Sequence, residues 1–175
     1  MYEFGGVAIR PIEETDLERM AQLRADMRVW TQLGDISMVN LKSQQDWFRG
    51  LQGDPCRRYF ILCSASRDFL GIVRMDEIDW INRSVRVGGD ILPEFHRQGY
   101  GAKMFELLKK YCFDFLNMHR LWLLVLEDNR PARELYLKAG FTEEGRQRQA
   151  IFRDGRYQDY IMMSLLRDGS DPERP

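Results

Sequence analysis

Residues 94–108 have the sequence EFHRQGYGAKMFELL, in which two glycines, Gly99 and Gly101, stand where an amphipathic helix begins. Glycine is a poor helix former, so its use here needs a reason other than helix stability. The first amides of a helix have no intrahelical acceptor and carry the positive end of the helix dipole, so they suit an anion such as phosphate. Glycine would let that anion approach the backbone. For a glycine pair taken alone, however, a tight turn between strand and helix is the better explanation.

The segments on either side of this loop alternate between the patterns of strand and helix. Residues 84–92, which precede it, have the alternating character of a strand. Residues 101–116, which follow it, place their apolar side chains on one helical face. Leu121–Leu126, LWLLVL, is a continuous apolar run typical of a strand covered on both faces. Another helix is expected over residues 129–139, with Gly140 directly after its end.

The rest of the chain extends the same mixed pattern. One helix is expected to begin at the N-cap Thr15 and the next at the N-cap Ser43, with residues 28–42 irregular between them. The further strands are expected over residues 7–12, 59–64, 69–78, 141–152 and 156–166. This order predicts one α/β domain over residues 1–167, an α+β mixed sheet whose parallel portion lies near the glycine loop. The tail, residues 168–175, is expected to be disordered.

The composition is that of an ordinary soluble globular protein. The 175 residues are 44% apolar and 30% charged, and the formal net charge is −1. The chain therefore lacks the basic surplus of a dedicated nucleic-acid binder, and its apolar runs are too short to cross a membrane, so neither partner is expected. The cysteines have no CxxC spacing and there are two histidines, which predicts no metal site and fits a reducing cytoplasm.

Two common phosphate-binding loops do not fit the glycine segment. The chain has no GxxxxGK[ST] loop for ATP or GTP, and no GxGxxG loop followed by an acidic residue for NAD. Instead, residues 96–102, HRQGYGA, are similar to the Q/R-x-x-G-x-G/A loop of the GNAT superfamily of acetyl-CoA-dependent N-acetyltransferases, with His96 at the position that is usually Arg or Gln. Residues 129–141, NRPARELYLKAGF, resemble that family's second motif, N-x-x-A-x-x-x-Y-x-k-x-G-F.

The resemblance covers roughly residues 5–167, and the ending of the chain is similar to the branch with ribosomal-protein, spermidine and amino-sugar acetyltransferases. It implies the GNAT fold, a mostly antiparallel sheet flanked by helices, in which a parallel strand pair splays apart beyond Gly88-Gly89. It also implies an enzyme that moves an acetyl group from acetyl-CoA to a primary amine of a small molecule. A protein N-terminus or a polyamine as acceptor, and a non-catalytic acyl-CoA-binding sensor, are the alternatives. A homodimer is one option for the assembly.

The resemblance also assigns roles to individual residues. In the family, the pantetheine arm lies between the parted strands and the pyrophosphate lies on the amides of the glycine loop. Tyr136 is implied as the acid that protonates the thiolate of coenzyme A, although its helical face would also suit a core tyrosine. The residues implied for cofactor binding are Ile91, Leu92, His96, Arg97, Gln98, Gly99, Tyr100, Gly101, Ala102, Asn129, Arg133 and Tyr136.

The general base is left open by the sequence. Asp90 is the catalytic candidate, but Arg74 is expected roughly opposite it in the hairpin, so an ion pair between them is the favoured interpretation. It is equally possible that a chain of water molecules carries the proton of the amine to Asp90, Glu127 or Asp128. Many relatives have a carboxylate at the position of Arg86.

The acceptor pocket is expected near residues 28–60, which carry more basic than acidic side chains. The basic ones are Arg28, Lys42, Arg49, Arg57 and Arg58, and the acidic ones are Asp35, Asp46 and Asp54. With Trp30, Arg74 and Arg86 as candidates for substrate binding, this balance disfavours a polyamine and favours an amine on a neutral or anionic carrier, such as a nucleotide-linked amino sugar. The alternative is a solvated face in which each cation is paired with a neighbouring acid.

Overall fold

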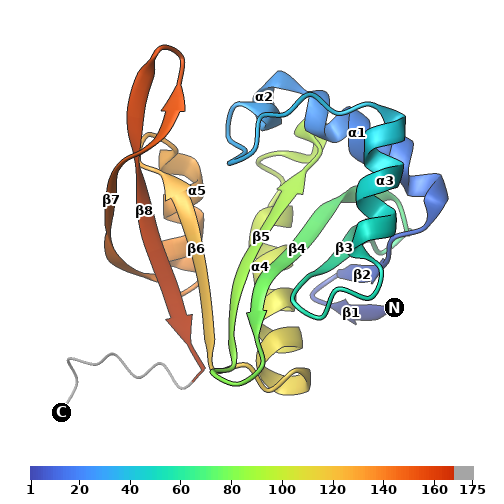
Figure 1. Cartoon of the computed structure of the whole chain (residues 1–175). Helices are drawn as coiled ribbons and strands as arrows, with labels where there is room; N and C mark the ends of the chain where they lie inside the picture. The colour runs from blue at the N-terminus through green and yellow to red at the C-terminus, as the bar shows by residue number, and fades with distance from the viewer. Residues whose placement is uncertain (168–175) are drawn as a thin grey trace.

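A computed structural model, which describes residues 1–167, has one eight-stranded mixed sheet with helices packed on both of its faces (Figure 1). The strands are β1 (Tyr2–Phe4), β2 (Val7–Pro11), β3 (Arg58–Ser64), β4 (Phe69–Asp79), β5 (Ser84–Ile91), β6 (Arg120–Leu126), β7 (Thr142–Arg153) and β8 (Arg156–Leu166). The helices are α1 (Leu17–Ala25), α2 (Met27–Trp30), α3 (Leu41–Leu51), α4 (Tyr100–Lys110) and α5 (Arg130–Lys138). The strand order is β1-β2-β3-β4-β5-β6-β8-β7. The tail that was expected to be disordered lies outside the described residues.

The two faces of the sheet bury different apolar clusters, because successive residues of a strand point to opposite sides. Val73 and Met75 of β4 pack in the larger cluster with Phe105 of α4. Ile72 of β4 packs in the smaller cluster with Leu17 of α1 and its neighbours. The helices α1–α3 therefore cover one face and α4 covers the other. None of the helices within residues 1–167 is long and apolar enough to cross a bilayer.

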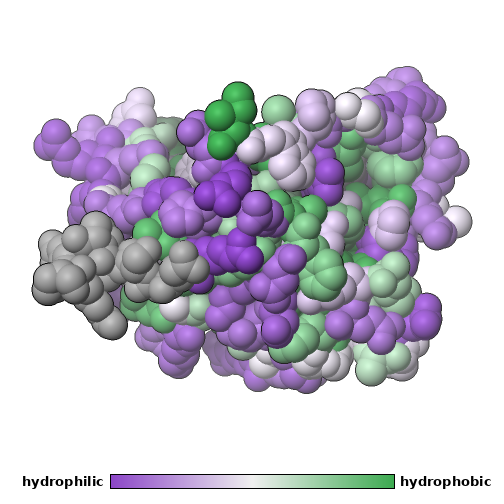
Figure 2. Space-filling view, turned by 90° about the horizontal axis from the view of Figure 1, so that it is seen from below, coloured by the Kyte–Doolittle hydropathy of each residue, from purple (hydrophilic) through white to green (hydrophobic). Residues whose placement is uncertain are grey.

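Strands β5 and β6 are the parallel neighbours of the sheet, and their pairing is short. It consists of Ser84 with Arg120, Val85 with Leu121, and Arg86 with Trp122. Beyond these pairs the strands separate, so the molecule divides into two halves that are joined at one end of β5 and β6 (Figure 1). Viewed from that joined end, the surface mixes hydrophilic and hydrophobic side chains (Figure 2).

The separation begins earlier than the sequence predicted, and Gly88-Gly89 has another role. A Cβ on Gly89 would lie 2.5 Å from the sulfur of Met104 and 2.7 Å from the carbonyl oxygen of Ile72. Real Cβ atoms do not come this close to their neighbours, so glycine at position 89 allows α4 to pack against β5. The prediction that the strands part beyond these glycines was wrong, because the last paired residue of β5 is Arg86.

The predicted caps of the first helices were also wrong. Asn40, not Ser43, caps α3, and the two side chains form a capping box in which Ser43 is the third residue of the helix. Before α1, residues 14–16 form a 3-10 turn, and Glu13 rather than Thr15 precedes it. The side chain of Asp16 is held by Arg10 of β2, which draws this turn onto the sheet.

Candidate active site

A cavity of about 1230 Å³ lies where β5 and β6 have separated. Its walls come from β4, β5, β6, the start of α4 and α5, and from the loop that follows α2. The parallel pair closes the cavity at one end, because Arg86 and Trp122 form the last register pair. Beyond this pair, the edges of β5 and β6 that face each other border a space and not another strand. A bound molecule could form hydrogen bonds with the backbone of these edges.

At the start of α4, a run of backbone amides is free to bind an anion. Within residues 1–167, the amides of Gln98 through Ala102 donate to no protein acceptor, and no side chain caps the helix. Gly99 is the N-cap residue and has φ +82, a left-handed conformation that suits glycine, while Arg97 has φ +60. Unpaired amides at the positive end of a helix dipole are the donors that a phosphate group requires.

His96 and Leu92 make contacts that the motif did not predict. The amide of Leu92 donates to the carbonyl of Leu70 in β4 at 2.9 Å, so it faces away from the gap, and the Leu92 side chain is buried against α1. The carbonyl of Ile91 does not face β4, and the His96 Nε2 lies 2.8 Å from its oxygen. The backbone of Ile91 therefore lies on the open edge of β5. The amide of Leu92 is not available there to a bound molecule.

Tyr136 lies on α5 and lines the cavity. Its ring packs edge-on against Phe105, with 5.1 Å between the ring centroids. Burial raises the pKa of Tyr136 to about 12, with the Arg74 guanidinium opposing this shift and the Asp90 carboxylate adding to it. A phenol with this pKa is fully protonated at neutral pH, so it can act as a proton donor.

Of Asn129 and Arg133, the two residues of the second motif implied for cofactor binding besides Tyr136, only Asn129 lies at the cavity. Asn129 lines the cavity and also caps α5, since its side-chain oxygen accepts from the amide of Ala132 at 3.2 Å. Arg133 points instead to β7, where its guanidinium pairs with Glu143. The predicted cofactor contact of Arg133 is thus a contact between helix and strand in the structure.

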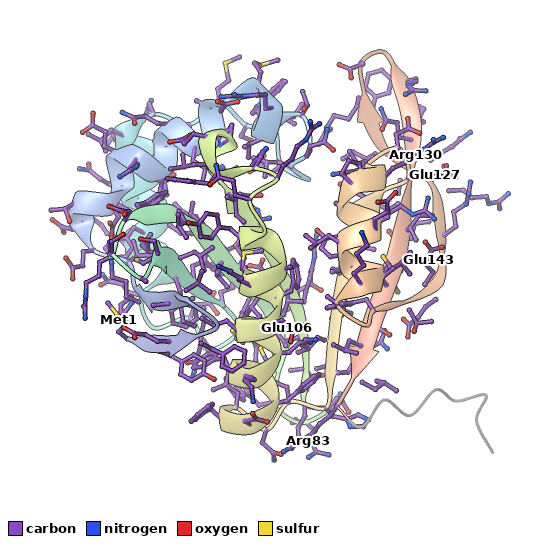
Figure 3. All side chains as sticks on the ribbon, turned by 180° about the vertical axis from the view of Figure 1, so that it is seen from behind. Met1, Arg83, Glu106, Glu127, Arg130 and Glu143 are labelled. Atoms are coloured by element: carbon purple, nitrogen blue, oxygen red, sulfur yellow. The ribbon has the colours of Figure 1, made fainter. Side chains whose placement is uncertain are left out.

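Each of the proposed proton acceptors is bound to an arginine. Asp90 pairs with Arg74 at 3.2 Å, although Arg74 lies opposite Gly88 and reaches Asp90 diagonally rather than directly. Glu127 pairs with Arg146. Asp128 pairs with Arg156 at 2.8 Å, and both Glu127 and Asp128 lie beyond the end of β6 that is far from Arg83 and the joined halves (Figure 3).

The predicted acceptor residues are only partly at the cavity. Arg74 and Arg86 line it, but Arg86 is paired with Glu77 at 3.0 Å. Trp30 does not line it, because the indole N–H donates to the carbonyl of Ile36 at 3.0 Å within its own loop. Trp30 was therefore a wrong prediction for the pocket.

Most of the basic side chains over residues 28–60 are paired with acids in the structure. The pairs are Arg28 with Asp26, Lys42 and Arg49 with Asp46, and Arg57 with Asp54, while Arg58 stacks on Trp80. Lys42 and Arg49 share the carboxylate of Asp46, and Arg58 has no acidic partner within residues 1–167, so the alternative of a paired face holds for most of these cations and a small basic surplus remains. Because most of this charge is compensated, the segment is only a weak argument against a polyamine.

Asp76 and Tyr59 are cavity residues that the sequence analysis missed. The phenol of Tyr59 on β3 donates to Asp76 Oδ1 on β4 at 2.6 Å. The available signal was the alternation of β4, where Arg74 and Asp76 are charged residues two apart and therefore on the same face of the strand.

Comparison with known proteins assigns this arrangement to a family. The family model described as "Acetyltransferase (GNAT) domain" matches residues 7–142. The spermidine N(1)-acetyltransferase of Vibrio cholerae is 28% identical over 160 residues, which are 91% of this chain and 92% of the relative. The enzyme of the same name from Escherichia coli K12 is 29% identical over 163 residues, 91% of this chain and 86% of the relative. The crystal structure of spermidine N-acetyltransferase from Vibrio cholerae in complex with CoA and spermine matches with a TM-score of 0.89 at 27% identity, covering 94% of this chain and 97% of that one.

Proposed function

The chain belongs to the GNAT acetyltransferase family and is an acetyl-CoA-dependent N-acetyltransferase, and from this premise we propose that its acceptor is a small aliphatic amine of the polyamine class. The relatives with this acceptor span nearly the whole chain. The cavity supports the same class, because Arg57, Arg74 and Arg86 on its wall are each paired with a carboxylate and so repel a cationic substrate less than free cations would. The charge argument for a nucleotide-linked amino sugar, which the sequence favoured, is weakened because Arg74 and Arg86 are each paired with a carboxylate.

The residues at the start of α4 fit coenzyme A. We propose that the amides of Gln98 through Ala102 hold the pyrophosphate, with Arg97 adding positive charge from the loop before the helix. The pantetheine arm would lie against the open edge of β5 near Ile91, with Asn129 on the opposite wall. Bound acetyl-CoA supplies the acetyl group as a thioester.

Tyr136 is the proposed acid. Its hydroxyl lies in the cavity on the α5 side, and its raised pKa keeps the proton in place until the sulfur of coenzyme A leaves. Asp90 holds Arg74 rather than an amine proton, so we propose that it positions Arg74 beside the thioester. The observation that carries the assignment is the meeting of this phenol and the free amides of α4 at one cavity between parted strands.

The test is turnover with several amines under the same conditions. Thiol release from acetyl-CoA would be measured with spermidine, a nucleotide-linked 4-amino sugar and a short peptide with a free N-terminus. We expect the highest kcat/KM with spermidine. A higher kcat/KM for either of the other two would contradict the polyamine class, and binding of acetyl-CoA without transfer to any amine would indicate the non-catalytic sensor.

A further inference from the structure

Among the described residues, one carboxylate of the cavity wall lacks a cationic partner: that of Asp76. The other cavity carboxylates pair with arginines, Asp35 with Arg24, Asp54 with Arg57, Glu77 with Arg86, and Asp90 with Arg74. The only hydrogen bond that Asp76 accepts within residues 1–167 comes from Tyr59. An ionised carboxylate can accept about four hydrogen bonds, so Asp76 retains most of its capacity for a ligand.

Tyr59 fixes the orientation of this carboxylate. Its ring packs against Trp47 of α3, with 5.1 Å between the centroids, and its phenol donates to Asp76 at 2.6 Å. Burial, followed by the hydrogen bond to Asp76, raises the pKa of Tyr59, so the phenol remains a donor. The second oxygen of Asp76 is therefore held in place with no partner from the described chain.

The charged groups around Asp76 carry one more negative than positive charge. Arg57 and Arg74 act on this neighbourhood, and each already pairs with another carboxylate, Asp54 and Asp90. Arg86, opposite Asp76 in the ladder, pairs with Glu77, so four carboxylates against three guanidinium groups leave a net charge of −1 on this wall. An ammonium group would neutralise that charge without displacing either existing ion pair.

The place of Asp76 in the sheet separates it from the reacting centre. Asp76 lies opposite Arg86, the last paired residue of β5 and β6, at the closed end of the cavity. The backbone of Asp90, whose charge adds to the raised pKa of Tyr136, is four residues farther along β5, about 13 Å at the rise of a strand. Arg74 lies between the two positions along β4, so an amine that reacts beside Tyr136 leaves Asp76 to a second amine of the same molecule.

We propose that Asp76, oriented by Tyr59, binds an ammonium group of the acceptor that is remote from the amine being acetylated, and so selects diamines and polyamines over monoamines. This inference rests on the proposed function. The inference goes beyond the proposed function because it assigns the selection of polyamines over monoamines to one carboxylate. This carboxylate can be removed without altering the cofactor site.

The experiment compares spermidine with butylamine, which has a single amine, in the wild-type protein and in Asp76→Asn. Asparagine keeps the size of the side chain and an oxygen for Tyr59 but removes the charge. We expect kcat/KM for spermidine to fall about 10- to 100-fold through KM, the range for losing one hydrogen bond to a charged group. We expect the weak activity with butylamine and the Kd for acetyl-CoA to stay within about twofold.

Two further variants serve as controls. Asp76→Glu keeps the charge and should recover part of the spermidine activity. Asp114→Asn removes the same charge from the surface beyond α4, where Asp114 faces Lys110, and should change neither KM. An unchanged KM for spermidine in a folded Asp76→Asn protein overturns the proposal, as does an equal loss with both amines. A wild-type protein that acetylates neither amine overturns the proposed function itself, and this result is visible before any variant is made.

Discussion

Tyr136 is a residue whose surroundings prepare it for acid catalysis. The ring is enclosed by Phe105 and Phe141, and burial raises its pKa to about 12. A raised pKa keeps the phenol neutral over the whole range in which the protein would work, so its proton is available to a leaving thiolate. The same enclosure would suit a core tyrosine, and the two roles differ only in what the hydroxyl does.

The variant Tyr136→Phe separates these roles. It keeps the ring and its aromatic contacts but removes the proton, so we expect kcat to fall about 10- to 100-fold or more, with the Kd for acetyl-CoA unchanged. Steady-state kinetics and calorimetry would measure the two quantities, and the melting temperature would check the packing. If kcat is unchanged while chemistry is rate-limiting, Tyr136 is a core residue only.

For single residues, the sequence predicted positions within motifs better than it predicted which side chains contact each other. Gly99 and Asn129 were assigned from spacing, and the structure places both where the motif implies, at the starts of α4 and α5. Asp76 was missed because its hydrogen bond comes from Tyr59, 17 positions away in the chain, and Trp30 was wrongly placed because its indole hydrogen bond depends on the path of a loop. A count of charges over a segment gives neither the contacts between distant residues nor the path of a loop.

At the scale of elements, the β7–β8 hairpin contacts the loop after α2 across the mouth of the cavity. Arg153 Nη2 donates to the carbonyls of Leu33 at 2.9 Å and Gly34 at 2.8 Å. Gly34 lies so near β8 that a Cβ would be 3.4 Å from the Tyr160 hydroxyl. The hairpin was predicted from its Asp-Gly turn, but this contact joins residues about 120 positions apart and leaves no local pattern.

Arg153 therefore holds the loop after α2 at the cavity, and Arg153→Ala tests whether this loop belongs to the acceptor site, as we propose. Loss of two hydrogen bonds to carbonyls should raise the KM for spermidine about 3- to 30-fold while the Kd for acetyl-CoA stays the same. Arg153→Lys, which offers a single ammonium in place of a planar fork, should have an intermediate effect. An equal change in the Kd for acetyl-CoA would show instead that the hairpin supports the whole cavity.

The start of α4 packs directly against α5, which gives Gly101 two roles. A Cβ at this position would lie 3.0 Å from Leu135 Cδ2, closer than nearly all real contacts. We expect Gly101→Val to weaken acetyl-CoA binding at least 10-fold and to lower the free energy of unfolding by about 1–3 kcal/mol, the usual cost of overpacking. Gly145→Val, at a glycine of β7 with open space around it, is the matched control. Unchanged affinity in folded Gly101→Val would contradict the placement of the pyrophosphate.

At the scale of the whole molecule, the site exists because two halves are joined only over a short length. The β5–β6 pair is extended by the turn at Arg83, whose carbonyl accepts from the amides of His119 and Arg120 (Figure 3). The order of strands and helices predicted a mixed sheet with a parallel portion near the glycine loop, and the resemblance to the GNAT family implied which two strands form it. The point of separation, after Arg86, has no signal of its own in the strand sequences.

An ion pair ties the turn before α1 to the sheet, and it makes the overall stability depend on pH. Arg10 of β2 binds both carboxylate oxygens of Asp16, at 2.6 and 2.7 Å, just before α1. Burial alone would raise the pKa of Asp16, but the bonds from Arg10 and from the Glu13 amide outweigh it, so the pKa lies below its usual value. A lowered pKa means that the folded state favours the ionised form.

Asp16→Asn should therefore destabilise the protein most at neutral pH. We expect a loss of about 2–3 kcal/mol at pH 7, less than for a fully buried pair because about a quarter of the Arg10 side chain is exposed. The stabilisation is present above the unfolded pKa of Asp, near 4, and is lost as the pH falls through the lower folded value, so the wild type and the variant should converge towards pH 2. Urea unfolding at several pH values would measure the difference, with Asp46→Asn on the exposed side of α3 as a control. A difference that stays constant from pH 7 to pH 2 would show that Asp16 stabilises the turn through its shape and not its charge.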